Sequence, residues 1–393
     1  MKDLERELAR GTGEREAWGA CMTNESSGKR TVVVHTPPGT RFCATHERIA
    51  HIRIAKRIAA LKGGSFGGQF DPASRHPDRP YFLPTDTIVG IDLARELGIV
   101  AEDDLFGGVV PYGFIGTKAI THGLISDSAL SPANWSSEFA TEVYDIVPRG
   151  YTAFCIEDAQ AAMHCLLREG PVRIKPVKAT GGRGQSIIRR ASEFEAVLEK
   201  LDQAQLSQFG LVLEEDLAAP LTYSVGQIRL EGQVASYYGV QNLVRDNFGQ
   251  TAYGGSDLSV VRGDFDDLVS VSDPPGEVRH AIAQAQRYDA AARRHFPEII
   301  ASRRNYDIIC GTSATGRRCS GVLEQSWRIG GATPGEITAL EAFAADPDLK
   351  IVEVSAVEAY GTCPPKPTNA IIYFEGVDQQ VGPITKYAHL RNA

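Results

Sequence analysis

The chain has 393 residues, of which 42% are hydrophobic and 23% are charged, and its formal net charge at pH 7 is -8. This composition is typical of a globular protein that is long enough for two or three domains and a large core. The acidic balance provides no broad basic surface of the kind that nucleic acid or an anionic membrane selects, so neither is expected as a partner. No apolar run approaches the roughly 18 to 20 residues of a membrane span, and the polar first residues lack the apolar core of a signal peptide.

Cysteine usage predicts the compartment. The seven cysteines are odd in number and include no Cys-x-x-Cys pair. This pattern argues against both a disulfide framework and a zinc knuckle. We therefore expect a protein of the reducing cytoplasm, and the sequence leaves open whether it forms a homo-oligomer.

The first 130 residues predict a leader followed by a small α/β domain. Residues 1–30 are polar and become rich in Gly and Ser, which is typical of a mobile leader. Residues 31–35 form a β-branched run that predicts a buried strand, and apolar residues recur at helical spacing over 46–61. Further strand and helix patterns continue, so we expect an N-terminal α/β domain over residues 31–130.

The next segment, residues 131–215, begins with a connection that crosses between domains. An amphipathic helix is predicted over 156–167 and a strand over 171–176, with Lys175 at its end. A second strand at 186–188 leads into a helix over 192–201, for which Ser192 and Glu195 predict a capping box.

A glycine-rich loop joins these two strands. It consists of Gly181, Gly182, Arg183 and Gly184. A Rossmann fingerprint or a Walker loop would lead from a strand directly into a helix, so neither fits this loop. The glycines would let a hairpin place backbone amides over phosphate groups, with Lys175 and Arg183 supplying positive charge. A plain surface hairpin is the alternative.

Two acids are expected to face each other in a later antiparallel sheet. Asp307 lies in a strand predicted over 305–311, and Glu324 lies in the strand that returns after a hairpin turn at 311–317. Adjacent carboxylates repel unless a cation lies between them, and oxygen ligands select Mg²⁺ or Mn²⁺. A single buried Asp with local hydrogen bonds is the alternative.

The end of that second strand carries three polar side chains at spacing two, which are Glu324, Ser326 and Arg328. If the strand continues, all three emerge on one face. Gly330 and Gly331 would let the backbone approach a ligand, and Thr333 predicts the N-cap of a helix whose first amides attract anions. A strand-turn-helix connection with a solvated polar edge is the alternative.

In this order the motifs resemble the ATP-grasp superfamily. They are Lys175 with its glycine loop, Glu214 three residues before Leu217, Asp307, and Glu324-x-Ser326-x-Arg328 before paired glycines. The resemblance covers about residues 110–345, and the whole chain resembles an uncharacterised bacterial family of this type. It implies an α/β and α+β fold in which two α+β subdomains clasp a nucleotide behind a small α/β domain. The lid subdomain would span 131–215, the C-terminal subdomain with the metal site 216–345, and an extension 346–393.

The resemblance also implies roles for individual residues, with ATP and Mg²⁺ as the cofactors and Mn²⁺ as an alternative metal. Lys175 would contact phosphates, Lys118 resembles the lysine that precedes the lid domain, and the glycine loop would be the lid. The adenine would bind at Glu214 and at the backbone of Glu215, Asp216 and Leu217. The metal would be held by Asp307, Glu324 and Ser326.

Two positions depart from the family pattern. Ser326 stands where the family usually has Asn. Serine is a shorter ligand, which could bind the metal through a water molecule or leave one coordination position open. No acid lies between Asp216 and Glu231, and Thr222 is near the position where a ribose-binding acid is usual.

The function that the resemblance implies is an ADP-forming ligase that activates a carboxylate as an acyl phosphate and transfers it to an amine. Its substrates would be small molecules or peptides. Arg328 would orient the carboxylate, while Lys175 and the metal would neutralise the transferred phosphoryl group. An ATP-grasp small-molecule kinase is one alternative. A degenerate nucleotide-binding or scaffold protein is another, which Ser326 and the missing ribose acid favour.

Overall fold

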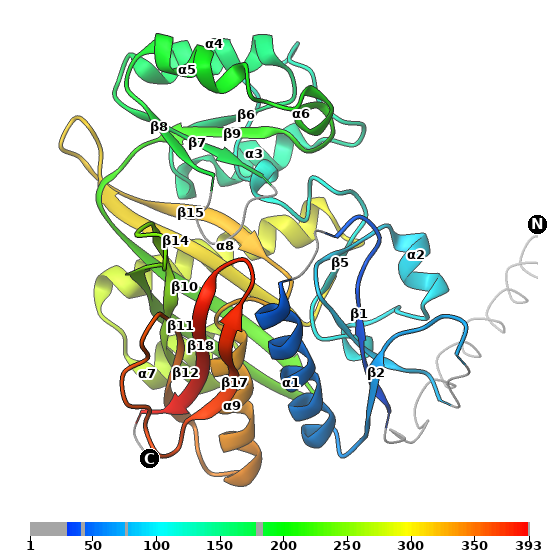
Figure 1. The fold of residues 1–393 in the computed structure, drawn as a ribbon. Coiled ribbons are helices and arrows are strands. Elements are labelled where there is room, and N and C mark those ends of the chain that lie inside the picture. The colour runs from blue at the N-terminus through cyan, green and yellow to red at the C-terminus, as the bar shows by residue number, and fades with distance from the viewer. Residues whose placement is uncertain (1–29, 41–43, 75–77, 178–183, 392–393) are drawn as a thin grey trace, which may run out of the picture.

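The computed structural model describes residues 30–40, 44–74, 78–177 and 184–391. Three parts are visible in Figure 1: an N-terminal domain, a small sheet with its helices at the top, and a large sheet below. The predicted leader over 1–30 lies almost wholly outside the described residues. Within the described ranges, none of the helices has both the length and the apolar character needed to span a membrane.

The N-terminal domain contains two three-stranded sheets. In the first, β1 (Val32–His35) lies between β2 (Phe66–Gln69) and β3 (Tyr81–Pro84), and both pairings are parallel. The second sheet has the order β13-β5-β4, with β4 (Ile88–Val89), β5 (Gly108–Val110) and β13 (Ile300–Ala301). The helical segments are α1 (Thr45–Leu61), α2 (Ile91–Glu96), η1 (Glu102–Asp104) and η2 (Lys118–Thr121). Since β13 comes from a distant part of the sequence, this domain is tied to the rest of the molecule.

A four-stranded antiparallel sheet forms the small subdomain, with the order β6-β9-β7-β8. Its strands are β6 (Gly150–Ala153), β7 (Val172–Pro176), β8 (Ser186–Ile188) and β9 (Leu211–Glu215). The helices α4 (Ile156–Leu167), α5 (Ala191–Leu198) and α6 (Gln203–Phe209) accompany them. The predicted helix over 156–167 is confirmed at both ends. The predicted capping box is wrong, because the N-cap of α5 is Arg190 and Ser192 lies inside the helix.

Residues 131–149 do not join this small sheet, although the predicted lid subdomain included them. They contain α3 (Ser137–Val143) and η3 (Tyr144–Ile146). The ring of Phe139 on α3 packs edge-on against Tyr288 of α8 (Gly276–His295), with centroids 5.3 Å apart. Because this aromatic contact buries Phe139, α3 packs with α8 and not with the helices of the small sheet.

The large sheet has eight antiparallel strands in the order β15-β14-β10-β11-β12-β16-β18-β17. Its first strands are β10 (Ala218–Leu230), β11 (Gln233–Arg245), β12 (Thr251–Arg262), β14 (Arg303–Thr312) and β15 (Arg318–Ser326). The others are β16 (Ile351–Tyr360), β17 (Ile371–Asp378) and β18 (Gly382–Leu390). The segment predicted as an extension, 346–393, therefore supplies three strands of this sheet. Val352, Val354 and Ala356 alternate as buried residues along β16, which explains why the segment is part of the sheet.

Helices cover both faces of the large sheet. On one face, α8 packs against β14 and β10, with α7 (Phe265–Ser272) beside it. On the other face, α9 (Thr333–Ala345) and α1 share one apolar core, in which Ile54 of α1 and Ile337 of α9 are buried together with Val354 of β16. The N-terminal domain and the large sheet thus form one continuous core.

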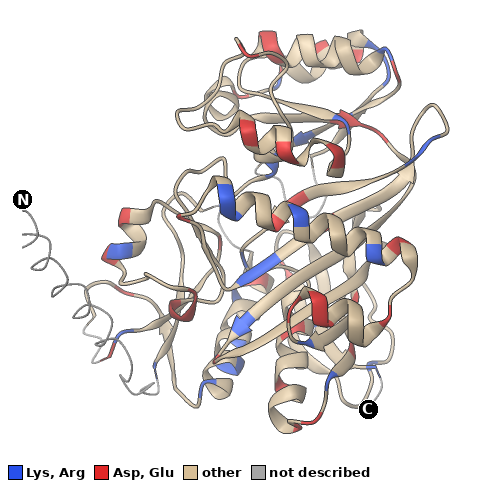
Figure 2. Ribbon diagram, turned by 180° about the vertical axis from the view of Figure 1, so that it is seen from behind, with Lys and Arg blue, Asp and Glu red and all other residues tan. Residues whose placement is uncertain are grey.

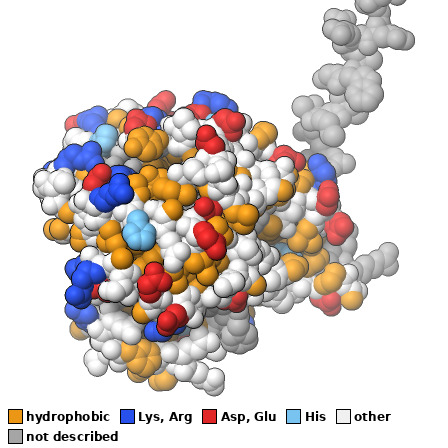
Figure 3. Space-filling model, turned by 90° about the horizontal axis from the view of Figure 1, so that it is seen from above, with side chains coloured by type: hydrophobic (Ala, Val, Ile, Leu, Met, Phe, Trp, Pro, Cys, Tyr) orange, Lys and Arg blue, Asp and Glu red, His pale blue; other side chains and the backbone are white. Residues whose placement is uncertain are grey.

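Charged residues are spread over the whole molecule. Figure 2 shows acidic and basic positions interleaved along the helices and strands, and Figure 3 shows both signs among apolar side chains on the face seen from above.

Candidate functional site

Lys175, Glu214 and His122 form a buried charged cluster on the small sheet. Lys175 on β7 lies diagonally across from Glu214 on β9, a geometry that brings long side chains into contact. Lys175 Nζ pairs with Glu214 Oε1, and His122 Nε2 lies 3.2 Å from Glu214 Oε2. Lys175 is 4% exposed and Glu214 is 1% exposed. Gly150 makes this possible, because a Cβ there would lie 2.9 Å from the His122 ring.

The neighbours of Glu214 hold this acid in its ionised form. Burial alone would raise the pKa of Glu214, but the charge of Lys175 and the hydrogen bond from His122 hold this pKa at about 2. Burial lowers the pKa of Lys175, and the charge of Lys118 acts in the same direction, against the opposing charge of Glu214. Glu214 is therefore a carboxylate at neutral pH.

A second lysine pairs with the acid at the edge of the large sheet. Lys118 on η2 is buried, and its Nζ lies 2.6 Å from Glu324 Oε2 on β15. Burial would raise the pKa of Glu324, yet the charge and hydrogen bond of Lys118 lower it, with help from Lys175 and Arg328. Lys118 and Lys175 thus place two positive charges between Glu214 and Glu324.

Asp307 faces Glu324, as predicted. The two are paired residues of the antiparallel strands β14 and β15, with an irregularity immediately after Asp307. Asp307 Oδ1 accepts hydrogen bonds from Ser224 Oγ (3.3 Å) and Asn305 Nδ2 (2.9 Å). Burial and then the charge of Glu324 raise the pKa of Asp307. Two carboxylates thus lie side by side, and each would be stabilised by a cation.

The donor set fits a magnesium ion. In the part of the chain that the structure describes, no three His, Cys, Asp or Glu side chains are grouped so that they could hold a metal. A metal here would therefore take Asp307 and Glu324, and would complete its shell with oxygens from water, substrate or a hydroxyl. Mg²⁺ is commonly bound in this way, through one or two carboxylates and phosphates. Ser326, the third predicted ligand, is the last residue of β15 and pairs with Asn305 in the sheet.

Arg328 does not lie on a continuing strand, which corrects one prediction. Because β15 ends at Ser326, the alternation of side chains ends there too. Arg328 lies in a bend, where its Nε is 3.7 Å from Asp86 Oδ1 of the N-terminal domain. Its charge still contributes to lowering the pKa of Glu324, so the guanidinium acts on the same site.

The paired glycines next to Arg328 accommodate protein side chains. A Cβ on Gly331 would lie 2.2 Å from the ring of Tyr253, and a Cβ on Gly330 would lie 3.6 Å from a guanidinium nitrogen of Arg303. We expected these glycines to let the backbone approach a ligand. The contacts show instead that glycine is required at Gly331 because the tyrosine ring fills the space.

The start of α9 also differs from the prediction. The N-cap is Ala332, and Thr333 Oγ1 accepts a hydrogen bond from the Gly330 amide at 3.1 Å. Glu336, in the first turn of α9, is fully buried and pairs with Arg303 rather than capping the helix. Arg303 competes successfully for Glu336 because a guanidinium is a stronger partner than a backbone amide.

The acidic corner after β9 has structural partners within the small subdomain. Glu215 Oε1 accepts a hydrogen bond from the Arg149 amide, and Asp216 pairs with Arg173. The amides of Glu215 and Asp216 donate to the carbonyl oxygens of Arg149 and Pro171. Of the four predicted adenine-binding residues, Glu214 is the one whose side chain joins the lysine cluster.

The remaining predicted residues are placed as follows. Leu217 is buried, and Thr222 lies on β10 two residues before Ser224, hence on the sheet face that carries Asp307. Gly181, Gly182 and Arg183 lie outside the described residues, while Gly184 has a φ of +71°.

Several site residues were missed by the sequence analysis. Asn305 precedes Asp307 by two residues in a predicted strand, so the alternation of strand side chains could have identified it. His122 and Ser224 gave no such local signal, because their partners Glu214 and Asp307 are 92 and 83 residues away.

Comparisons with known proteins show the family and the fold of the chain. A family described as "Protein of unknown function (DUF3182)" matches residues 34–388. Among solved structures, N5-carboxyaminoimidazole synthetase from Staphylococcus aureus, complexed with ADP, is similar with a TM-score of 0.52 and 10% identity, over 94% of this chain and 96% of that one. This likeness shows that the chain has the ATP-grasp fold.

Other structural similarities have lower scores. The biotin carboxylase domain of Hydrogenobacter thermophilus 2-oxoglutarate carboxylase has a TM-score of 0.45 and 14% identity, over 92% of this chain and 86% of that one. D-alanyl-alanine synthetase A from Vibrio cholerae has a TM-score of 0.43 and 11% identity, over 76% of this chain and 89% of that one. No curated protein matches the chain in sequence.

Proposed function

The chain belongs to the DUF3182 family, and we propose that it is an ATP-dependent, ADP-forming ligase that joins a carboxylate to an amine. The observation that carries this proposal is the paired arrangement of Lys118 with Glu324 and Lys175 with Glu214. Lys175 lies on the small sheet, Lys118 pairs with the edge of the large sheet, and the charge of Lys118 acts on Lys175. The two lysines therefore lie where the small and large sheets approach each other, which is where an ATP-grasp fold holds its nucleotide. The protein of the same fold from Staphylococcus aureus is described as complexed with ADP.

Each group would have a defined part in the reaction. A carboxylate oxygen of the substrate attacks the γ-phosphorus of ATP, the bond to the β-phosphate oxygen breaks, and ADP leaves. The amine then attacks the acyl carbon, phosphate leaves, and the nitrogen loses a proton. Lys118 and Lys175 would neutralise the phosphate oxygens, and Asp307 and Glu324 would hold Mg²⁺, which supplies further charge neutralisation when bound.

A carboxylate is the substrate group that Arg328 suits best. Its guanidinium lies in a bend, is about one third exposed (32%), and has Asp86 as its acidic neighbour at 3.7 Å. At this distance the ion pair is weak, so the guanidinium of Arg328 could leave Asp86 and bind a substrate carboxylate through two hydrogen bonds. The position also lies within electrostatic reach of Glu324, so a substrate held there would be near the transferred phosphoryl group.

Arg328→Lys is expected to lower turnover roughly 30- to 150-fold, because lysine keeps the charge but loses the planar fork that binds a carboxylate at two points. The loss should appear mainly in kcat/KM for the carboxylate, with far less change in ATP affinity. Arg317→Lys, in the exposed β14–β15 hairpin, is a control that should retain full turnover. Equal losses in both variants would contradict the role of Arg328.

The proposed reaction is tested with a panel of carboxylates and amines, scored by ADP release and by mass spectrometry of the product. We expect ADP and phosphate together with an amide, formed only when the amine is present. A stable phosphorylated product that ignores the amine would indicate a kinase. An AMP product would contradict both reactions, since the lysines and acids are assigned here to the terminal phosphate.

A further inference from the structure

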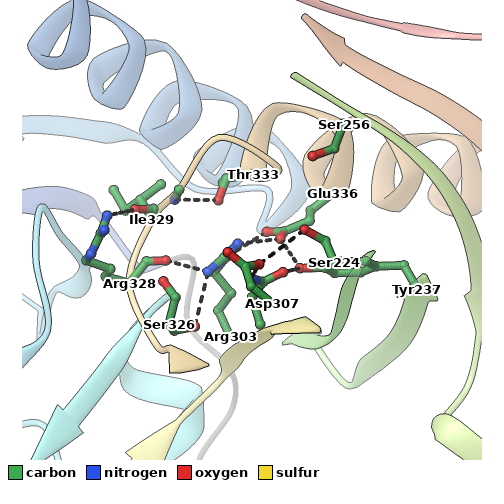
Figure 4. A network of polar contacts seen from close by, with 12 residues as sticks. Ser224, Tyr237, Ser256, Arg303, Asp307, Ser326, Arg328, Ile329, Thr333 and Glu336 are labelled. Carbon is green, nitrogen blue, oxygen red and sulfur yellow. Dashed lines mark hydrogen bonds and ion pairs between the residues drawn. The ribbon is translucent and has the colours of Figure 1, made fainter. Parts of the chain in front are cut away.

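A buried ion pair contacts the bend that carries Arg328. Arg303 on β14 and Glu336 in the first turn of α9 are 1% and 0% exposed. Arg303 Nε lies 2.9 Å from Glu336 Oε2 and Nη2 lies 2.7 Å from Oε1, so the contact is bidentate. Figure 4 shows the guanidinium between Glu336 and the segment from Ser326 to Arg328.

The remaining nitrogen of Arg303 holds the backbone of that segment. Its Nη1 donates to the carbonyl oxygen of Arg328 at 2.5 Å and lies 3.3 Å from the carbonyl oxygen of Ser326. Gly330 packs against the same guanidinium, and its amide donates to Thr333 at the start of α9. One side chain thus fixes the chain from the end of β15 to the beginning of α9.

The other side of the ion pair leads to the metal-binding acid. Tyr237 Oη lies 2.6 Å from Glu336 Oε1 and 2.9 Å from Asn305 Oδ1, so its one proton serves either acceptor. Asn305 Nδ2 then donates to Asp307 Oδ1 at 2.9 Å. A continuous series of polar contacts therefore runs from the Arg328 bend to Asp307.

Stability alone does not explain this arrangement. A buried ion pair is often no more stabilising than apolar residues of the same volume. Apolar side chains could not make these hydrogen bonds. Each nitrogen of the Arg303 guanidinium has a specific acceptor on Glu336 or on the bend. A planar guanidinium is suited to that task, since its donors have fixed relative directions.

We propose that Arg303 and Glu336 are positioning residues that hold the Arg328 bend at a fixed place relative to Asp307. This inference rests on the proposed function, in which Arg328 binds the carboxylate substrate and Asp307 binds magnesium. Neither Arg303 nor Glu336 touches substrate in this scheme. Their effect is to keep the carboxylate and the metal at the spacing that phosphoryl transfer needs.

The first test compares Arg303→Lys with Arg304→Lys by hydrogen exchange and mass spectrometry. Arg304 is the next residue of β14, is also buried, and pairs with Glu102 and Asp289 on the opposite face. Amide exchange over residues 326–333 should become roughly tenfold faster in Arg303→Lys and stay unchanged in Arg304→Lys, because Arg303 donates to carbonyl oxygens of this segment and Arg304 bonds to Glu102 and Asp289 instead. Equal exchange in the two variants would overturn the inference.

This first test needs no substrate, so it is independent of the proposed activity. Where turnover is measurable, Arg303→Lys should also raise KM for the carboxylate while leaving KM for ATP unchanged. A merely structural role would change both constants or neither. If the wild type showed no ATP turnover, the proposed function would fail, and the exchange rates would still decide whether Arg303 holds the bend.

If Arg303→Lys does not fold, a second pair of variants with smaller structural changes tests the proposal. Tyr237→Phe removes the hydroxyl between Glu336 and Asn305. Tyr306→Phe removes an equally buried hydroxyl that bonds to Asp289 and to the Trp327 indole in the bend, but to neither Asn305 nor Asp307. Mn²⁺ affinity in the presence of ADP, measured by electron paramagnetic resonance, should fall about tenfold in Tyr237→Phe only. Unchanged affinity, or the same fall in both variants, would overturn the connection to Asp307.

Discussion

Lys175→Met is expected to weaken ATP binding by roughly 10- to 150-fold, because the variant loses a charged contact to a phosphate group. The same change leaves Glu214 buried with His122 as its partner, so the free energy of unfolding should fall by about 3 to 5 kcal/mol. Calorimetric ATP titration and urea unfolding measure the two effects separately.

A double variant separates binding from stability. Lys175→Met with Glu214→Gln removes both charges, so most of the lost stability should return while ATP binding stays weak. Arg190→Met is the control, since Arg190 lies in the same subdomain but pairs with Glu193 at the start of α5. It should bind ATP as the wild type does. Wild-type ATP affinity in Lys175→Met would refute the assignment of this lysine.

The acid dependence of stability follows from the same pair. The pKa of Glu214 is held at about 2 in the folded protein, below its ordinary value of 4.5. A lowered folded-state pKa means that the carboxylate stabilises the fold above about pH 4.5, and that this contribution is lost as the pH falls towards 2. The contribution is on the order of 3 kcal/mol. In the double variant, the free energy of unfolding should therefore decline less steeply over this range of pH.

Glu324→Gln is expected to reduce magnesium-dependent turnover roughly 100-fold or more, because a neutral amide oxygen lacks the negative charge with which a carboxylate binds the metal. The substitution keeps the volume of the side chain, so the fold should be retained. Turnover measured against magnesium concentration should show a higher half-saturating value as well as a lower maximum. The variant also leaves Lys118 without its carboxylate partner, which circular dichroism and thermal unfolding would monitor.

Glu341→Gln is the control for this variant. Glu341 on α9 pairs with Arg57 and has a side-chain exposure of 26%, close to the 33% of Glu324. Glu341 lies between α1 and α9, away from Lys118 and Lys175, so the turnover of Glu341→Gln should match that of the wild type. Full magnesium-dependent activity in Glu324→Gln would remove the basis for the metal site.

The parts of the site that the sequence predicted correctly are those whose geometry is local. The short hairpin between β14 and β15 brings Asp307 opposite Glu324, because antiparallel strands joined by a tight turn have one register. The ATP-grasp fold was likewise predicted from the order of the motifs, and the structural likeness confirms it.

The parts that could not be predicted depend on contacts between distant segments. Nothing near Glu336 in the sequence indicates that Arg303, rather than the helix N-cap, would bind it. The glycine at position 331 predicted that a ligand would lie close to the backbone, whereas the neighbour in the structure is the ring of Tyr253 from β12. The strands of 346–393 carried no motif, so the alternating burial of β16 became visible only with its partner strands.

The central claim is that the lysines and acids between the two sheets bind a magnesium-nucleotide complex. Isothermal titration calorimetry of the wild-type protein with ATP, with and without magnesium chloride, tests it without knowledge of the acceptor substrates. We expect ATP to bind at one site per chain, with a dissociation constant that is at or below roughly 1 mM and rises when magnesium is removed. No binding of ATP with magnesium at that concentration, in a protein that circular dichroism shows to be folded, would contradict it.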